Sequence, residues 1–214
     1  GYEVTTYRID GEYEDGRHPK QVEFTSDLLE DLRRRDFTIN AMAWRPDRGL
    51  VDPFGGKADI ELGVIRAVGN PHQRFAEDAL RILRACRFSA ELGYAVEPCT
   101  YQGMLENKGL LSKISAERVT HELQKLLLGP HAGDALLDCV DALSAVLPEL
   151  VAMKGFDQQT PYHIYDVLEH TARVVLFQNG IQAVDLVVDL IACDLVFRID
   201  EKQFPVVTLE DTAD

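Results

Sequence analysis

The spacing of apolar positions changes near residue 52. Before it, short runs such as Glu3–Ile9 and Ile39–Trp44 are rich in β-branched residues and partly alternate with polar ones, which predicts strands. After it, apolar residues recur every three or four positions over longer stretches, which predicts helices. The sequence therefore predicts an α+β fold with a short β-sheet followed by a helical region.

Capping and turn residues divide the first part further. Ser26 or Asp27 can cap a helix over Leu28–Arg34, and Glu30 stands three residues after Asp27, as in a capping box. The remaining features expected here are a loop over 11–19, a turn over 46–49, a returning strand at Leu50–Val51 and a break at Asp52–Gly56.

The second part contains five stretches with helical apolar spacing and no internal repeat. The predicted helices are Arg74–Leu92, Thr100–Asn107, Ala116–Leu128, His131–Leu143 and Tyr162–Phe177.

Composition narrows the class of protein. The chain has 214 residues, 46% of them hydrophobic, which is enough to bury a core, and no apolar run approaches the length of a membrane span. A cytoplasmic protein is expected. The net charge of −14 argues against strong non-specific binding to nucleic acid, so an RNA partner requires a local basic surface or one outside this segment.

The four cysteines lack the CxxC spacing of zinc sites, and no disulfide framework is indicated. Cys86 and Cys139 stand among apolar neighbours and are expected to pack as small hydrophobic side chains. The sequence indicates no set of metal ligands in this chain.

One candidate site is the acid and base cluster Glu77-Asp78-Ala79-Leu80-Arg81. On a helix, Asp78 and Arg81 would share one face, and Arg84 and Arg87 would continue the stripe. A carboxylate only accepts hydrogen bonds and a guanidinium only donates them, so the pair can match the amine and the ring nitrogen of cytosine or adenine. The alternative is an ordinary surface salt-bridge ladder.

A second cluster lies at a predicted helix-to-strand corner. Arg33-Arg34-Arg35 ends a helix, where cations are favourable, and Asp36 and Asn40 follow. At such a corner Arg35, Asp36 and Asn40 can converge on a ligand, and the two clusters together predict binding of a nucleoside triphosphate.

The chain resembles the bacterial class II nucleotidyltransferases, which comprise CCA-adding enzymes and poly(A) polymerases. The resemblance covers about residues 1–130 in unbroken order. It rests on the stretches YEVTTYRIDGEYEDGRHP, EDLRRRDFTINAMAW, DPFGGKADI, RFAEDALRILRACRFSAELGY and ISAERVTHELQKLL.

This resemblance implies transfer of C and/or A from CTP and ATP to the tRNA 3′ end, with release of pyrophosphate and with Mg²⁺ as the metal. It implies that Arg35 contacts the nucleotide and that Asp78 and Arg81 select the base. Arg84 and Arg87 would then assist on the phosphates.

The resemblance also assigns three further features near the start of the chain. Glu3 is the catalytic candidate, a third carboxylate beside a metal-binding pair, although a glutamate at a strand edge is equally read as a solvated side chain. The loop Asp10–Arg17 would help to switch from C to A addition. Asp52–Asp59 would form a hinge between head and neck.

The sequence departs from the family in two places. The glycine-rich GGxxRD segment and the Asp-x-Asp pair of the family are missing, and nucleotidyl transfer needs metal ions to neutralise developing charge. This chain alone is therefore expected to transfer nothing. Pro161–Thr171 resembles the start of an HD phosphohydrolase domain with His163 and His170, but Cys193-Asp194 stands where a His-Asp pair is needed.

We therefore expect three parts: 1–52 from a nucleotidyltransferase head, 53–130 as a helical neck with the base-selecting helix, and 131–214 as a body with a degenerate or truncated HD-like start. The main hypothesis is part of a tRNA nucleotidyltransferase. The alternatives are a poly(A) polymerase, a non-catalytic RNA-binding remnant and an HD-type hydrolase. The oligomeric state is left open.

Overall fold

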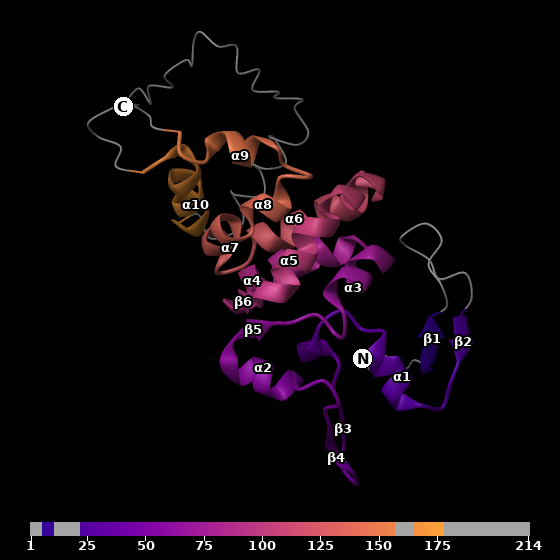
Figure 1. Ribbon diagram of the computed structural model, residues 1–214. Helices are drawn as coiled ribbons and strands as arrows, with labels where there is room; N and C mark the ends of the chain where they lie inside the picture. The colour runs from indigo at the N-terminus through magenta and orange to yellow at the C-terminus, as the bar shows by residue number, and fades with distance from the viewer. Residues whose placement is uncertain (1–5, 11–21, 157–164, 178–214) are drawn as a thin grey trace, which may run out of the picture.

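The computed structural model describes residues 6–10, 22–156 and 165–177 (Figure 1). Small two-stranded sheets accompany the first helices, and the rest of the described chain is helical, so the predicted α+β class is confirmed. The elements are β1 Arg8–Asp10, β2 Val22–Phe24, α1 Leu28–Arg33, η1 Thr38–Asn40, β3 Ala43–Arg45, β4 Gly49–Val51, α2 Gly56–Leu62, β5 Val64–Ile65, α3 Pro71–Glu77, α4 Leu80–Leu92, β6 Ala95–Val96, α5 Pro98–Asn107, η2 Lys108–Lys113, α6 Ala116–Leu127, α7 Ala132–Asp138, α8 Val140–Leu143, α9 Glu149–Met153 and α10 Val167–Phe177.

The described sheets are small and separate. β1 pairs with β2 and β3 pairs with β4, both antiparallel, whereas the short β5 and β6 are parallel. The β3–β4 hairpin projects from the molecule at the end opposite α9 and α10 (Figure 1). The predicted returning strand at Leu50–Val51 is confirmed as part of β4. Residues 1–5 of the first predicted strand and the predicted loop over 11–19 lie outside the described residues.

The cap of α1 is confirmed in part. The Asp27 side chain accepts a hydrogen bond from the Leu29 backbone at 2.8 Å, so Asp27 is the cap. The predicted capping box is wrong, because the Asp27 backbone N–H donates to Thr25 Oγ1 and Glu30 instead pairs with Arg33.

The strand predicted over Ile39–Trp44 is wrong in its first half. Thr38–Asn40 forms the short helix η1, and only Ala43–Arg45 is a strand. Hydrogen bonds from side chains replace the strand-to-strand backbone hydrogen bonds here. Asp36 accepts from the Phe37 backbone N–H at 2.9 Å, and the Thr38 hydroxyl donates to Asp59 at 2.6 Å.

The single helix predicted over Arg74–Leu92 is also wrong. The backbone leaves helical geometry at Asp78, with φ −147° and ψ 103°, and the chain forms α3 before it and α4 after it. Asp78 Oδ1 accepts a hydrogen bond from the Leu80 backbone N–H at 3.1 Å, which satisfies a donor at the start of α4.

Of the other predicted helices, two are confirmed, one is divided and one is described only in part. Thr100–Asn107 and Ala116–Leu128 are confirmed as α5 and α6 with small shifts at their ends. His131–Leu143 divides at Cys139 into α7 and α8. The last predicted helix is described only from Val167, as α10.

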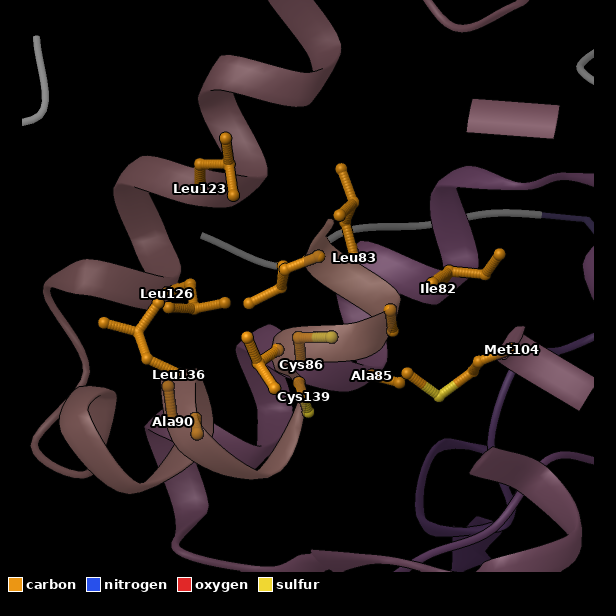
Figure 2. Packing of buried hydrophobic residues seen from close by; sticks show 14 of the residues in the cluster. Ile82, Leu83, Ala85, Cys86, Ala90, Met104, Leu123, Leu126, Leu136 and Cys139 are labelled. Carbon is orange, nitrogen blue, oxygen red and sulfur yellow. The ribbon is translucent and has the colours of Figure 1, made fainter. Parts of the chain in front are cut away.

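The core lies around α4, which packs on α6 and α7. Figure 2 shows Cys86 of α4 beside Cys139, with Leu126 and Leu136 next to them. Both cysteines are fully buried and free, as the sequence predicted. A hydrogen bond with Cys139 and burial raise the pKa of the Cys86 thiol well above its ordinary value.

Within the described residues, no helix combines the length and apolar character needed to cross a membrane.

A close backbone approach sets the distance between α6 and α4. A methyl group added at Gly129 would lie 2.6 Å from the carbonyl oxygen of Ala90 on α4. We expect Gly129→Ala to lower the free energy of unfolding by about 1–3 kcal/mol through overpacking. Thermal or urea unfolding measures this. Gly109→Ala is the matched control, since nothing lies within 4 Å of its added methyl group. Equal stability of the two variants would contradict the packing argument.

Candidate functional site

A cleft of about 450 Å³ lies where the corner after α1, the start of α4 and the start of α6 meet. Its walls carry five arginines and two aspartates, an excess of three positive charges in a chain whose net charge is −14. The lining residues are Arg34, Arg35, Asp36, Asn40, Asp78, Leu80, Arg81, Arg84 and Arg118. The structure thus brings together six of the residues singled out in the sequence, namely Arg35, Asp36, Asn40, Asp78, Arg81 and Arg84.

Asp31 on α1 holds two of these arginines. Its Oδ1 accepts from Arg34 at 2.7 Å, and its Oδ2 accepts from Arg35 Nη2 at 3.3 Å. Burial raises the pKa of the Asp31 carboxyl, but hydrogen bonds from Arg34, the Arg8 backbone and Arg35 outweigh it, so the pKa lies below its ordinary value of 3.8. An ionised Asp31 therefore aims both guanidinium groups.

Arg35 retains a donor that none of the described residues uses. Its Nη1 donates to the Asn40 carbonyl at 3.3 Å, but its Nε is buried and has no hydrogen-bond partner among the described residues. A buried donor without a partner costs free energy, and it lies on a residue that lines the cleft.

Asp36 joins the corner to α4. One oxygen accepts from the Phe37 backbone and, at 3.4 Å, from the Asn40 side chain. The other pairs with Arg84 of α4, with the two nitrogens Nε and Nη2 at 2.8 and 2.6 Å. The predicted convergence of Arg35, Asp36 and Asn40 at one corner is thus what the structure shows, with Arg84 added to it.

Arg81 is buried and anchored on one side. Its Nη1 donates to Glu77 at 2.6 Å and to the Arg74 carbonyl at 2.9 Å, and its Nη2 donates to the Arg34 carbonyl at 3.2 Å. These bonds use three of the five N–H groups of a guanidinium and leave two. Asp78 precedes α4 instead of sharing a continuous helix face with Arg81, yet both line the cleft.

Arg87 takes a different direction from the one that the sequence predicted. It does not line the cleft. Its Nη1 pairs with Glu91 at 2.9 Å, and its Nε lies 2.8 Å from Glu122 on α6, a close ion contact without hydrogen-bond alignment. Its guanidinium also covers the Phe88 ring at 4.2 Å. Arg87 therefore links α4 to α6, and its contact with phosphates stays a prediction.

No binding role was predicted for three of the lining residues: Arg34, Leu80 and Arg118. Arg118 lies on α6, 40 positions after Asp78, and its Nη2 donates to Asp78 Oδ2 at 3.2 Å. It stands inside a stretch that carries the family resemblance, which is the one signal that could have indicated it.

The predicted hinge at Asp52–Asp59 includes two carboxylates that fix α2. Asp52 accepts from the Gly56 and Lys57 backbones at 2.8 and 2.9 Å. Asp59 is buried, where it accepts from Thr38 and Arg66. Whether this segment bends stays a prediction.

Several predicted features lie outside the described residues: Glu3, residues 11–17 of the proposed switching loop, His163, and Cys193-Asp194. His170 lies within α10. In the described part of the chain, no three His, Cys, Asp or Glu side chains are grouped so that they could hold a metal ion. The two aspartates of the cleft are each paired with an arginine, so the cleft does not fit a metal.

Comparison with known proteins identifies relatives of the chain. The family model for the poly A polymerase head domain matches residues 1–66, and the model for the probable RNA and SrmB-binding site of polymerase A matches residues 93–153. A CCA-adding enzyme of Geobacillus stearothermophilus is 51% identical over 150 residues, which cover 70% of this chain and 37% of that protein.

Solved structures show the same kinship. The crystal structure of the Bacillus stearothermophilus CCA-adding enzyme in complex with CTP matches with a TM-score of 0.60 and 40% identity, covering 82% of this chain and 38% of that one. A CCA-adding enzyme in complex with ATP matches with a TM-score of 0.50 and 34% identity, covering 56% and 30%. The chain thus spans less than two-fifths of the length of these relatives.

The head and RNA-binding matches, together with the fold, define the chain as nucleotidyltransferase-like. It belongs to the family of bacterial class II CCA-adding enzymes and poly(A) polymerases.

The Asp31 cluster predicts a pH dependence. Because the folded pKa of Asp31 lies below 3.8, its contribution to stability is present above pH 3.8 and is lost as the pH falls through the lower, folded value. We expect Asp31→Asn to cost roughly 1.5–3 kcal/mol at pH 7, the worth of hydrogen bonds to a charged group. Urea unfolding at pH 7 and at successively lower pH measures this. The two proteins should converge in acid, and a constant difference would contradict the assignment.

Proposed function

We propose that this chain carries the nucleotide-selecting part of a tRNA nucleotidyltransferase, which adds C and/or A from CTP and ATP to the tRNA 3′ end with release of pyrophosphate. The observation that carries the proposal is the placement of an acceptor, Asp78, and a donor, Arg81, in one arginine-lined cleft. The relatives described as CCA-adding enzymes, with CTP and with ATP, support it.

The pair can read a base edge directly. Each Asp78 oxygen takes one hydrogen bond from the protein, which leaves it able to accept an exocyclic amine as well. Arg81 retains two N–H groups for a ring nitrogen. Cytosine and adenine both present an amine beside an unprotonated ring nitrogen, so one protein surface can accept both.

Guanine and uracil reverse this pattern, with a ring N–H beside a carbonyl. They would place an acceptor against Asp78 and a donor against Arg81. Each buried polar group left unpaired costs about 1–3 kcal/mol. A site that hydrogen-bonds one pattern therefore rejects the other strongly.

The remaining arginines supply the charge for a triphosphate. Arg34, Arg35 and Arg84 line the same cleft, and the first two are held by Asp31 while Arg84 is held by Asp36. Guanidinium groups that are already aimed bind phosphate oxygens with little loss of side-chain entropy.

Mg²⁺ and the carboxylates that would hold it, Glu3 among them, belong to this proposal and concern residues outside the described part of the chain. The division at residues 52 and 130 and the hinge role of Asp52–Asp59 are also proposals. A tRNA substrate is consistent with the cytoplasmic location expected from the sequence.

The decisive experiment measures incorporation of radiolabelled CTP and ATP onto a tRNA that lacks its 3′-terminal CCA. It is run with this chain and with a longer form that carries head sequence upstream. Incorporation of C and A, with G and U excluded, supports the proposal. If the longer form adds nothing, or the chain binds the four triphosphates without preference, the proposal fails.

Asp78→Ala should relax base choice, because it removes the acceptor for the amine. We expect the preference for CTP and ATP over GTP and UTP to fall by about tenfold, equivalent to one lost interaction of 1.4 kcal/mol. Calorimetric titration of the chain with each triphosphate measures it. Asp47→Ala is the control, since Asp47 is an exposed carboxylate on the β3–β4 turn. Full discrimination retained in Asp78→Ala would disprove base selection by this residue.

Arg35→Ala should instead weaken all four triphosphates alike, by about tenfold, because it removes a charged donor to the phosphates. The same titrations give the ratios between bases, which should not change. Arg48→Ala, at an exposed arginine of the hairpin turn, should leave every affinity as it was. A base-dependent loss in Arg35→Ala would contradict its assignment to the phosphates.

A further inference from the structure

Arg118 reaches the cleft from a helix that the sequence did not connect with base selection. It stands in the first turn of α6, and its Nη2 donates to Asp78 Oδ2 at 3.2 Å. Both side chains are largely buried, with 25% of Arg118 and 19% of Asp78 exposed. A pair at this depth is screened less by solvent than a surface ion pair.

Two hydrogen bonds hold the side chain of Asp78. The residue lies between α3 and α4 in an extended conformation. Its two oxygens are held from two directions, Oδ1 by the Leu80 backbone N–H at 3.1 Å and Oδ2 by Arg118. Two bonds from separate elements determine the plane of the carboxylate, which one bond cannot do.

The helix that carries Arg118 is itself fixed on the base-selecting helix. Leu123 and Leu126 of α6 are buried in the shared core, and Glu122 lies 2.8 Å from Arg87 of α4. Arg118 therefore approaches Asp78 from a helix that is packed on α4. Its other terminal nitrogen, Nη1, is buried with no hydrogen-bond partner among the described residues.

We propose that Arg118 is a positioning residue for base selection, which holds the Asp78 carboxylate in the plane where it accepts the amine of cytosine or adenine. This inference rests on the proposed function. Since Arg118 acts through Asp78 and not on the phosphates, its loss affects the choice of base and leaves the common triphosphate affinity unchanged.

The test titrates the 214-residue chain with CTP, ATP, GTP and UTP by calorimetry. For Arg118→Ala we expect the affinities for CTP and ATP to fall by about tenfold, the equivalent of one positioned hydrogen bond, and those for GTP and UTP to stay unchanged. Arg118→Lys, which keeps a charged donor, should restore part of the preference. Lys125→Ala removes an exposed cation from the same helix and should change nothing.

A double-mutant cycle separates positioning from direct contact. In the Asp78→Ala background, Arg118→Ala should cause no further loss of preference, because the group that it positions is gone. Additive losses, or an equal weakening of all four triphosphates, would overturn the inference. If Arg118→Ala does not fold by circular dichroism, Arg118→Met, which keeps the unbranched stem, takes its place.

Failure of the inference and failure of the proposed function give different results. Absence of any base preference in the unsubstituted chain disproves the proposed function itself. A preference that is present in the unsubstituted chain and intact in Arg118→Ala disproves only the role of Arg118.

Discussion

The carbonyl oxygen of Arg34 accepts hydrogen bonds from both Arg74 and Arg81, each at 3.2 Å. This carbonyl lies just after α1, whereas the two donors come from α3 and α4, some 40 and 47 positions later in the chain. The contact fixes the corner that carries Arg35 and Asp36 against the start of α4. The ion pair between Asp36 and Arg84 joins the same corner to α4 a second time.

Carboxylates in this site serve to aim arginines. Asp31 holds Arg34 and Arg35, Asp36 holds Arg84, and Glu77 holds Arg81. Each ion pair costs free energy because both charges lose water, but it leaves some guanidinium donors directed at the cleft. This arrangement explains how a strongly acidic chain presents a basic cleft, and why its overall charge was a poor guide to the local field.

Much of the fold and site could be predicted from the sequence because the signals are local. Apolar spacing located α5 and α6, and Asp27 marked the start of α1. The break at Asp78 was missed because apolar residues continue the helical spacing across it. The hydrogen bond from the Leu80 backbone N–H to the Asp78 side chain stabilises the break between the helices. The spacing of apolar residues gives no sign of such a bond.

The contrast between Arg87 and Arg118 shows the limit of spacing. Arg87 stands on the same helix as Arg81 and Arg84, yet Glu122 and the Phe88 ring draw it toward α6 and out of the cleft. Arg118 is far from the cluster in sequence, yet the packing of α6 on α4 brings it to Asp78. An arginine pairs with a carboxylate that lies close to it in space, and the tertiary structure determines which carboxylates are close.

The sequence alone determined the kinds of groups present: a carboxylate that can accept and guanidinium groups that can donate hydrogen bonds, an excess of cations, and the apolar faces that bury α4. Tertiary structure decided which of them meet. Helix packing fixes separations to within an ångström, and hydrogen bonds and ion pairs form only at such distances. For that reason residue type and order indicated which polar groups gather at the cleft, while the packing of the helices placed Arg118 in its lining and Arg87 outside it.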